Sequence, residues 1–322
     1  MIGMIINRMK DQLSILREYS LQEDLYLFST TIDYLLCRIF YGYCIDDYTC
    51  NSSGRFTSNV FRNRFFSFKR WQFVLKRLND TKDVSILDDK VIFLKFFKKY
   101  IKHDWIYPKE ATIEQFNNFI NSHHQIISKP TKSIYGLGVT IFSTSNAISS
   151  YTALCSKDIL LEEQIKQHPS LSIGGKSVNT IRVYSILDRN NKVHILKSIL
   201  RVGTGNSIVD NFHSGGVIYP INLQYGIIEA YGVQKNSNKR IFYHPGTEQC
   251  MIGYKIPSWG KILTLVRDAH IMLKNVRYIG WDIVVLENGD VDIIEANSNA
   301  DHALFSRVGY DKLFYDKIKA LL

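Results

Sequence analysis

The side chains best suited to chemistry lie near the C-terminal end of the chain, between residues 280 and 297. Asp282 and Glu295 belong to two apolar runs on either side of Asn288-Gly289. Asn-Gly between apolar runs is a strong hairpin signal, because a type I′ turn needs two residues with positive φ. If these two residues form the turn, Asp282 lies directly opposite Glu295, and Asn297 points the same way two residues later. The sequence therefore predicts a β-hairpin that brings three oxygen-bearing side chains together.

This arrangement suggests a metal site. The same register predicts an otherwise apolar face, formed by Val284, Leu286, Val291 and Ile293. Two facing carboxylates at the end of such a face repel one another unless a cation lies between them. Carboxylate and amide oxygens suit Mg²⁺, which usually binds phosphate oxygens as well. The alternative is an ordinary hairpin whose acids reach solvent.

The composition limits the classes of protein to which the chain can belong. It has 322 residues, 45% of them hydrophobic, and 40 Lys and Arg against 30 Asp and Glu. The formal charge of +10 favours anionic partners without choosing among them. Five cysteines without a CxxC pair indicate a reduced, cytoplasmic protein. The most apolar stretch, Ile32 to Ile45, contains Asp33 and Arg38 and is too short to span a membrane.

Three segments follow one another along the chain. Residues 1–85 are predicted to be helical, and an apolar stripe recurs there at helical spacing with basic residues on the other side: Phe61, Phe65, Phe68, Trp71, Leu75 and Leu78. This stripe predicts one helix over residues 61–78 that either docks on the core or lies on a membrane surface. Short apolar runs separated by turns then predict strands in a lobe at 86–158 and another at 159–322. The expected fold class is α+β, behind a helical N-terminal segment.

Several motifs, in order along the chain, resemble the ATP-grasp superfamily, in particular the group associated with sugar transfer and polysaccharide biosynthesis. The motifs are Asn179-Thr180-Ile181-Arg182-Val183, Asp210 to Gly216, His244-Pro245, Gly253 to Trp259, Tyr278 to Asp282, and Glu295 to Asn299. The likeness runs from about residue 85 to about residue 310. It implies an ATP-grasp core, in which two α+β lobes hold ATP and Mg²⁺ between them.

The resemblance also assigns roles to individual residues. It implies Mg²⁺ ligation by Asp282, Glu295 and Asn297. It implies phosphate contacts from Lys90 and Lys129, together with the loop residues Ser133 and Gly136. It implies that adenine and ribose are held by Glu162, Glu163, Gln164 and Ile165. The candidate catalytic residues are Arg182, Arg201, Asn211 and His213, and Asn211 also lies near the metal and the phosphates.

Some of these residues have plainer interpretations. Lys90 stands in a run of lysines that are usually just solvated, Glu162-Glu163 would otherwise be a surface pair, and His213 could be a buried structural histidine. One departure from the superfamily also matters. Members often carry an acidic residue that contacts ribose just before the Ile-Arg pair, where this chain has Thr180. The resemblance therefore leaves ribose recognition to the acids at 162 and 163.

These observations together predict a carboxylate–amine (or carboxylate–thiol) ligase that acts through an acyl phosphate. Its expected partners are an amine and a small-molecule or glycan carboxylate, in particular a carboxylate linked to a sugar in polysaccharide biosynthesis. An ATP-grasp kinase that phosphorylates a hydroxyl remains an alternative. Another is a basic binding module for a membrane or for nucleic acid, with a peripheral membrane contact through residues 61–78. Nucleic acid is not expected as a partner, because the hairpin acids would repel its phosphates.

Overall fold

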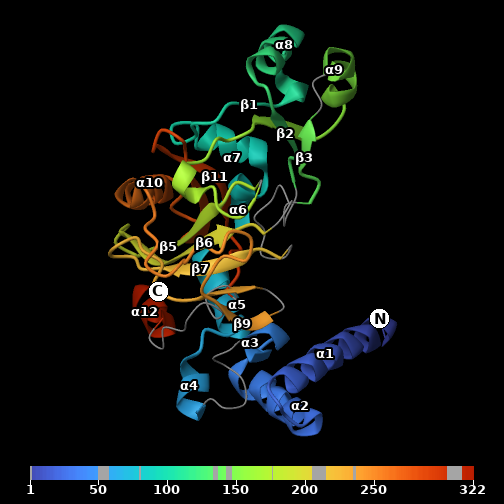
Figure 1. The fold of residues 1–322 in the computed structure, drawn as a ribbon, viewed down its shortest axis with the longest axis vertical. Helices are drawn as coiled ribbons and strands as arrows, with labels where there is room; N and C mark the ends of the chain where they lie inside the picture. Colours follow the sequence, from blue (N-terminus) through green and yellow to red (C-terminus); the bar gives the residue numbers. More distant parts are fainter. Residues whose placement is uncertain are drawn as a thin grey trace. The chain divides into compact units, whose positions relative to one another are not determined.

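The computed structural model describes residues 2–49, 58–79, 81–132, 137–142, 147–175, 177–204, 215–234, 237–302 and 314–322. These residues form two compact units (Figure 1). One unit joins Met1–Leu78 to Asp301–Leu322, and the other is Asn79–Ala300. The last residues of the chain therefore belong with the N-terminal helices. Within the described residues, no helix is both long enough and apolar enough to cross a membrane.

The first unit is helical. Its elements are α1 (Ile2–Gln22), α2 (Leu27–Leu36), the π-helix η1 (Cys37–Tyr41), α3 (Ile45–Thr49), α4 (Asn59–Arg64), α5 (Phe68–Leu78) and α12 (Phe314–Leu321). Its core is rich in tyrosine, with Tyr34 and Tyr48 packed edge to face at 5.5 Å between ring centroids. The Tyr48 hydroxyl donates to the Asp33 carboxylate, which also accepts two hydrogen bonds from Arg62. The charged groups of this core are therefore partnered.

The prediction of one helix over residues 61–78 is wrong, because the chain breaks between α4 and α5. At the break, the Ser67 hydroxyl donates to the Tyr41 carbonyl, and the Phe68 amide donates to the Asp47 carboxylate at 2.8 Å. Asp47 thus stabilises the first turn of a new helix. Phe65 and Trp71 are buried. This part of the stripe packs inside the protein, so it is not a surface available to a membrane.

The second unit begins with α6 (Thr81–Asp88) and α7 (Lys90–Phe96), followed by a small antiparallel sheet. The sheet has the order β1-β4-β2-β3, from strands β1 (Trp105–Ile106), β2 (Ile126–Pro130), β3 (Thr140–Phe142) and β4 (Ile159–Glu163). Helices α8 (Ile113–Ser122) and α9 (Ala147–Cys155) lie on its far side from the large sheet in Figure 1. Ile126 and Leu161 pack with these helices, whereas Leu160 joins the main core. Alternation along β4 therefore turns its neighbouring side chains toward different surroundings.

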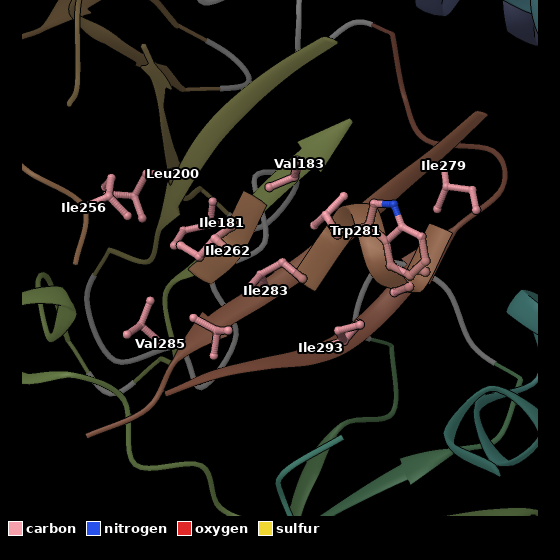
Figure 2. Packing of buried hydrophobic residues seen from close by; sticks show 14 of the residues in the cluster. Ile181, Val183, Leu200, Ile256, Ile262, Ile279, Trp281, Ile283, Val285 and Ile293 are labelled. Atoms are coloured by element: carbon pink, nitrogen blue, oxygen red, sulfur yellow. The ribbon is translucent and has the colours of Figure 1, made fainter. Parts of the chain in front are cut away.

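The large sheet is antiparallel, with the order β11-β10-β5-β6-β7-β8-β9. Its strands are β5 (Thr180–Leu187), β6 (Val193–Val202), β7 (Val217–Ile221), β8 (Gly232–Gln234), β9 (Ser237–Ile241), β10 (Tyr278–Val285) and β11 (Val291–Asn297). One face packs under helix α10 (Trp259–Ile271), whose Ile262 lies beside Ile181 of β5 in the apolar cluster that also contains Ile283 of β10 (Figure 2). Helices and two antiparallel sheets, which follow a helical N-terminal segment in the chain, confirm the expected α+β fold class.

Candidate active site on the large sheet

The predicted opposition of Asp282 and Glu295 is confirmed. The two residues are register partners in the β10–β11 hairpin, and Asn297 faces Gly280 two positions further along. The predicted turn is wrong. Leu286 pairs with Asp290 across three intervening residues, and Gly289 has the positive φ of +79° that the turn requires.

A β-bulge reconciles the longer turn with the predicted pair. The register shifts after the Asp282–Glu295 pair, so that Ile283 faces Ile293 and Ile294 is the extra residue. The bulge changes which side chains share a face. Ile293 and Val291 lie with the buried core residues, not with Val284, so the predicted apolar surroundings of the acids are partly wrong. The face of Asp282 instead carries Asp292, which is the partner of Val284.

Asp282 is held by two arginines from neighbouring strands. Arg182 is its register partner on β5, and its Nε and Nη2 donate to the two carboxylate oxygens at 2.5 and 2.8 Å. Arg201 on β6 donates from Nη1 to Oδ2 at 3.1 Å. Burial alone would raise the pKa of Asp282, but the two guanidinium groups outweigh burial and hold the pKa below its usual value. Asp282 is therefore an ionised, buried carboxylate whose charge is met by protein.

Glu295 is in the opposite electrostatic state. Burial and the adjacent charge of Asp282 raise the pKa of the Glu295 carboxyl, against the lowering effect of Lys90, Arg182 and Lys129. An additional cation beside this carboxyl group would stabilise its ionised form. Lys90 and Lys129, which belong to different elements, both favour the ionised form of Glu295.

Local structure explains how the two lysines reach this place. Lys90 is the first residue of α7, directly after its N-cap Asp89, and its amide donates to the Thr131 carbonyl at 3.0 Å. That contact ties the start of α7 to the end of β2. Lys129 on β2 is a diagonal neighbour of Glu162 on β4, and the two form a salt bridge. Lys90 on a helix and Lys129 on a strand thus both act on the Glu295 carboxyl.

The predicted nucleotide-binding acids separate onto opposite faces of β4. Glu162 is buried beside Lys129, whereas Glu163 accepts a hydrogen bond from the Asp104 amide at 2.8 Å and lies 3.7 Å from His123. Beyond β4 the chain crosses to the large sheet. Gln164 donates its amide to the Gln125 carbonyl, and Ile165 is half-buried. The structure therefore brings Glu162, but not Glu163, to the lysine.

A histidine outside the sequence motifs, His103, lies beside the Lys129–Glu162 pair. His103 is buried, and its Nδ1 lies 2.7 Å from the carboxylate of Asp292 on β11. Its Nε2 lies 3.9 Å from Glu162 and has no hydrogen-bond partner among the described residues. Burial would lower the pKa of His103, but Asp292 and Glu162 outweigh it and raise the pKa. The available signal was Asp292, an acid within a strand of apolar residues.

Other residues of the motifs have structural roles. The Asn179 side chain donates to the Leu171 and Ile173 carbonyls and accepts from the Gly203 amide. His244 is also buried and lies 3.2 Å from the Gly203 carbonyl. These contacts position the loops beside β5 and β6. The predicted residues Ser133, Gly136, Asn211 and His213 lie outside the described residues.

Comparisons with known proteins identify the family of this chain. A family model described as sugar-transfer associated ATP-grasp matches residues 70–317. The chain therefore belongs to the sugar-transfer associated ATP-grasp family, and its fold is the ATP-grasp fold. No curated protein sequence gives a significant match.

Several solved structures of ATP-grasp enzymes and related synthetases also match this chain, at low sequence identity. The ATP-grasp ligase PsnB, complexed with a minimal precursor, has a TM-score of 0.49 and 13% identity over 76% of this chain and 63% of its own. The ADP complex of PurK, an N5-carboxyaminoimidazole ribonucleotide synthetase, has a TM-score of 0.43 and 10% identity over 74% and 53%. A carboxyaminoimidazole ribonucleotide synthase from Aspergillus clavatus, complexed with ATP, has a TM-score of 0.43 and 11% identity over 69% of this chain and 47% of its own. This chain thus spans less than two thirds of the length of these proteins.

Proposed function

We propose that this protein is an ATP-dependent carboxylate–amine ligase that activates its carboxylate substrate as an acyl phosphate. The observation that carries the proposal is the row of charged side chains across three strands, Glu295, Asp282 and Arg182, with Arg201 beside it. Lys90 and Lys129 add positive charge near Glu295. Such a row offers ligands for a cation and fixed charges for phosphate oxygens on one surface.

The described side chains fit Mg²⁺ and a nucleotide. Asp282 Oδ1 accepts one hydrogen bond, from Arg182, within the part of the chain that the structure describes, so a lone pair remains for a cation. A cation would stabilise the ionised form of Glu295, which burial and the charge of Asp282 disfavour. Asn297, on the same face, adds an amide oxygen. These three residues would hold Mg²⁺, which supplies charge neutralisation on phosphate oxygens.

The protein's own cations have a separate task in the proposed reaction. Arg182 cannot lose its proton, and its contact with Asp282 fixes the guanidinium plane. Lys129 is fixed in the same way by Glu162. Preorganised charges of this kind stabilise negative charge that develops during phosphoryl transfer without further reorganisation. A carboxylate acceptor then needs positioning and charge neutralisation, and no nucleophile from the enzyme.

The acceptor we propose is a sugar-linked carboxylate, which fits the family's association with sugar transfer, and the second substrate we propose is an amino acid or another amine. The first test supplies ATP, Mg²⁺ and candidate glycan carboxylates such as uronic acids, with hydroxylamine replacing the amine. We expect a hydroxamate and stoichiometric ADP, because hydroxylamine intercepts an acyl phosphate. A stable phosphate monoester without hydroxamate would instead identify a kinase. The matched control is the Glu295→Gln variant, which should form neither product.

A further inference from the structure

The first unit presents an apolar helical surface on its outside. The 26–40 apolar surface, as we call it, runs along α2 and η1 and consists of the exposed side chains of Tyr26, Phe28, Ile32, Leu35, Leu36, Ile39 and Phe40. Phe28 is 78% exposed, Ile39 68% and Phe40 72%. Scattered exposed apolar residues are common, but a continuous stripe of this size usually marks an interaction site.

The stripe is an ordered helical face, turned outward. Residues 28, 32, 35, 36 and 39 follow the helical repeat. The opposite face, with Thr30, Tyr34 and Cys37, is the one that is buried. In a helix that only packs against its own protein, the apolar stripe would be the buried face. Here the core takes a tyrosine, a threonine and a cysteine, and the larger aliphatic and phenyl groups remain outside.

The charges around this surface indicate the chemistry of its partner. The acidic residue within it, Asp33, is turned inward and bonded to Arg62. Arg38 is exposed on the helix, and Lys69 lies beside its end, where its amide donates to the Gly42 carbonyl. Residues 51–78 contain no acidic residue. Arg38 and Lys69 therefore place two exposed basic side chains beside the Phe40 end.

The other end of the stripe has the opposite charge. Glu23 and Asp24 precede Tyr26 in the chain. Beyond the Phe40 end, Asp46 is exposed, whereas Asp47 is buried and accepts hydrogen bonds from the Cys44 and Phe68 amides. The surface thus combines aromatic and aliphatic groups with a basic margin at one end. A surface of this composition suits the boundary between the headgroups and the acyl chains of a bilayer that contains anionic lipid.

We propose that the 26–40 apolar surface binds the face of an anionic lipid bilayer, with the helices lying along it. The aromatic groups at Phe28 and Phe40 enter the interfacial layer, and Arg38 and Lys69 contact lipid phosphates. A second copy of the chain is a poorer partner, because it carries the same net charge of +10 and presents the same basic margin. The membrane contact goes beyond the proposed ligase activity and does not depend on it.

Flotation tests this contact with the intact protein. Vesicles of phosphatidylcholine alone are compared with vesicles of phosphatidylcholine mixed with phosphatidylglycerol, at low and high salt. We expect the protein to float with the mixed vesicles at low salt and to lose most of this binding at high salt. The double variant Phe28→Ser/Ile39→Ser changes two exposed positions and should retain its helical circular dichroism. Its partition should be about tenfold weaker.

A matched control carries the same kind of change elsewhere. Ile271→Ser/Met272→Ser alters two exposed apolar residues at the end of α10 and should float as the wild type does. Failure of the wild type to float with mixed vesicles overturns the proposal. A salt-independent flotation that is equal on both vesicles also overturns it. A dimer in sedimentation velocity that Phe28→Ser/Ile39→Ser abolishes, without flotation, would show that the surface binds a second copy.

Discussion

At the scale of single residues, the facing carboxylates of the hairpin differ in what their charges meet. Asp282 is bonded to Arg182 and Arg201, whereas burial and Asp282 itself raise the pKa of Glu295. Two acids that are equivalent in the sequence pattern therefore have different tasks. Asp282 holds the arginines in place, and in the proposed reaction it would also offer a ligand atom, whereas Glu295 is the carboxyl whose ionisation an added cation would favour most.

This difference predicts opposite effects on stability. Asp282→Asn should lower the free energy of unfolding by about 3–5 kcal/mol, because it leaves buried guanidinium groups without their counter-charge. Glu295→Gln should leave the free energy unchanged or raise it, because it removes a buried like charge beside Asp282. Both variants should lose ATP turnover. Urea unfolding and ADP release measure the two properties, and equal destabilisation by both substitutions would contradict the assignment.

At the scale of elements, His103 connects the Lys129–Glu162 pair of the small sheet to the large sheet. It follows the turns after α7, binds Asp292 of β11 and approaches Glu162 of β4. Asp292 also accepts hydrogen bonds from the backbone amides of Lys102 and His103, both at 2.9 Å. The buried acid thus fixes the segment between α7 and β1, and through the histidine it affects the side chain that holds Lys129.

We expect His103→Asn to raise the KM for ATP by about tenfold, the effect of one charge-assisted contact of about 1.4 kcal/mol, while kcat changes less. The asparagine amide keeps a donor near Asp292, but the substitution removes the imidazole, whose raised pKa favours a positive charge beside Glu162. Lys102→Ala is the matched control, because only the backbone amide of Lys102 contacts Asp292 and its side chain is exposed. An unchanged KM in His103→Asn would exclude a positioning role.

At the scale of the whole molecule, each unit has its own core, and the core of the second unit lies between the large sheet and α10. A polar chain crosses this core: the Trp281 indole donates to the Ser185 hydroxyl, which lies 2.7 Å from His270 Nδ1. His270 Nε2 lies 3.1 Å from the Val276 carbonyl, which can only accept, so Nε2 carries the proton. Nδ1 is then the acceptor for Ser185. A second proton on the ring would break this chain of hydrogen bonds.

Burial accordingly lowers the pKa of His270 from 6.5 to about 4. Because the folded state disfavours the proton, the stability from this group is complete above pH 6.5 and is lost as the pH falls toward 4. The loss should reach about 3 kcal/mol. Urea unfolding at a series of pH values measures it. His270→Gln should be less stable at pH 7 and should show a weaker dependence on pH in this window; an unchanged dependence would assign the acid loss to other groups.

Part of the site could be predicted from the sequence because it depends on local geometry. The opposition of Asp282 and Glu295 follows from strand alternation and one turn, and the three-residue turn and the bulge at Ile294 offset one another. Lys129 at the end of a strand was predictable for the same reason. The α+β class and the helical start also follow from patterns within short windows.

The partners of these residues could be decided only by the tertiary structure. Arg182 meets Asp282 across 100 residues of chain, and Arg201 meets it across 81. These contacts depend on β5 lying next to β10 and on β6 following it, which no local pattern encodes. The separation of Glu162 from Glu163 depends on which face of β4 meets the main core. The sequence by itself determined which groups could do chemistry, and the packing of distant strands decided their charges and their neighbours.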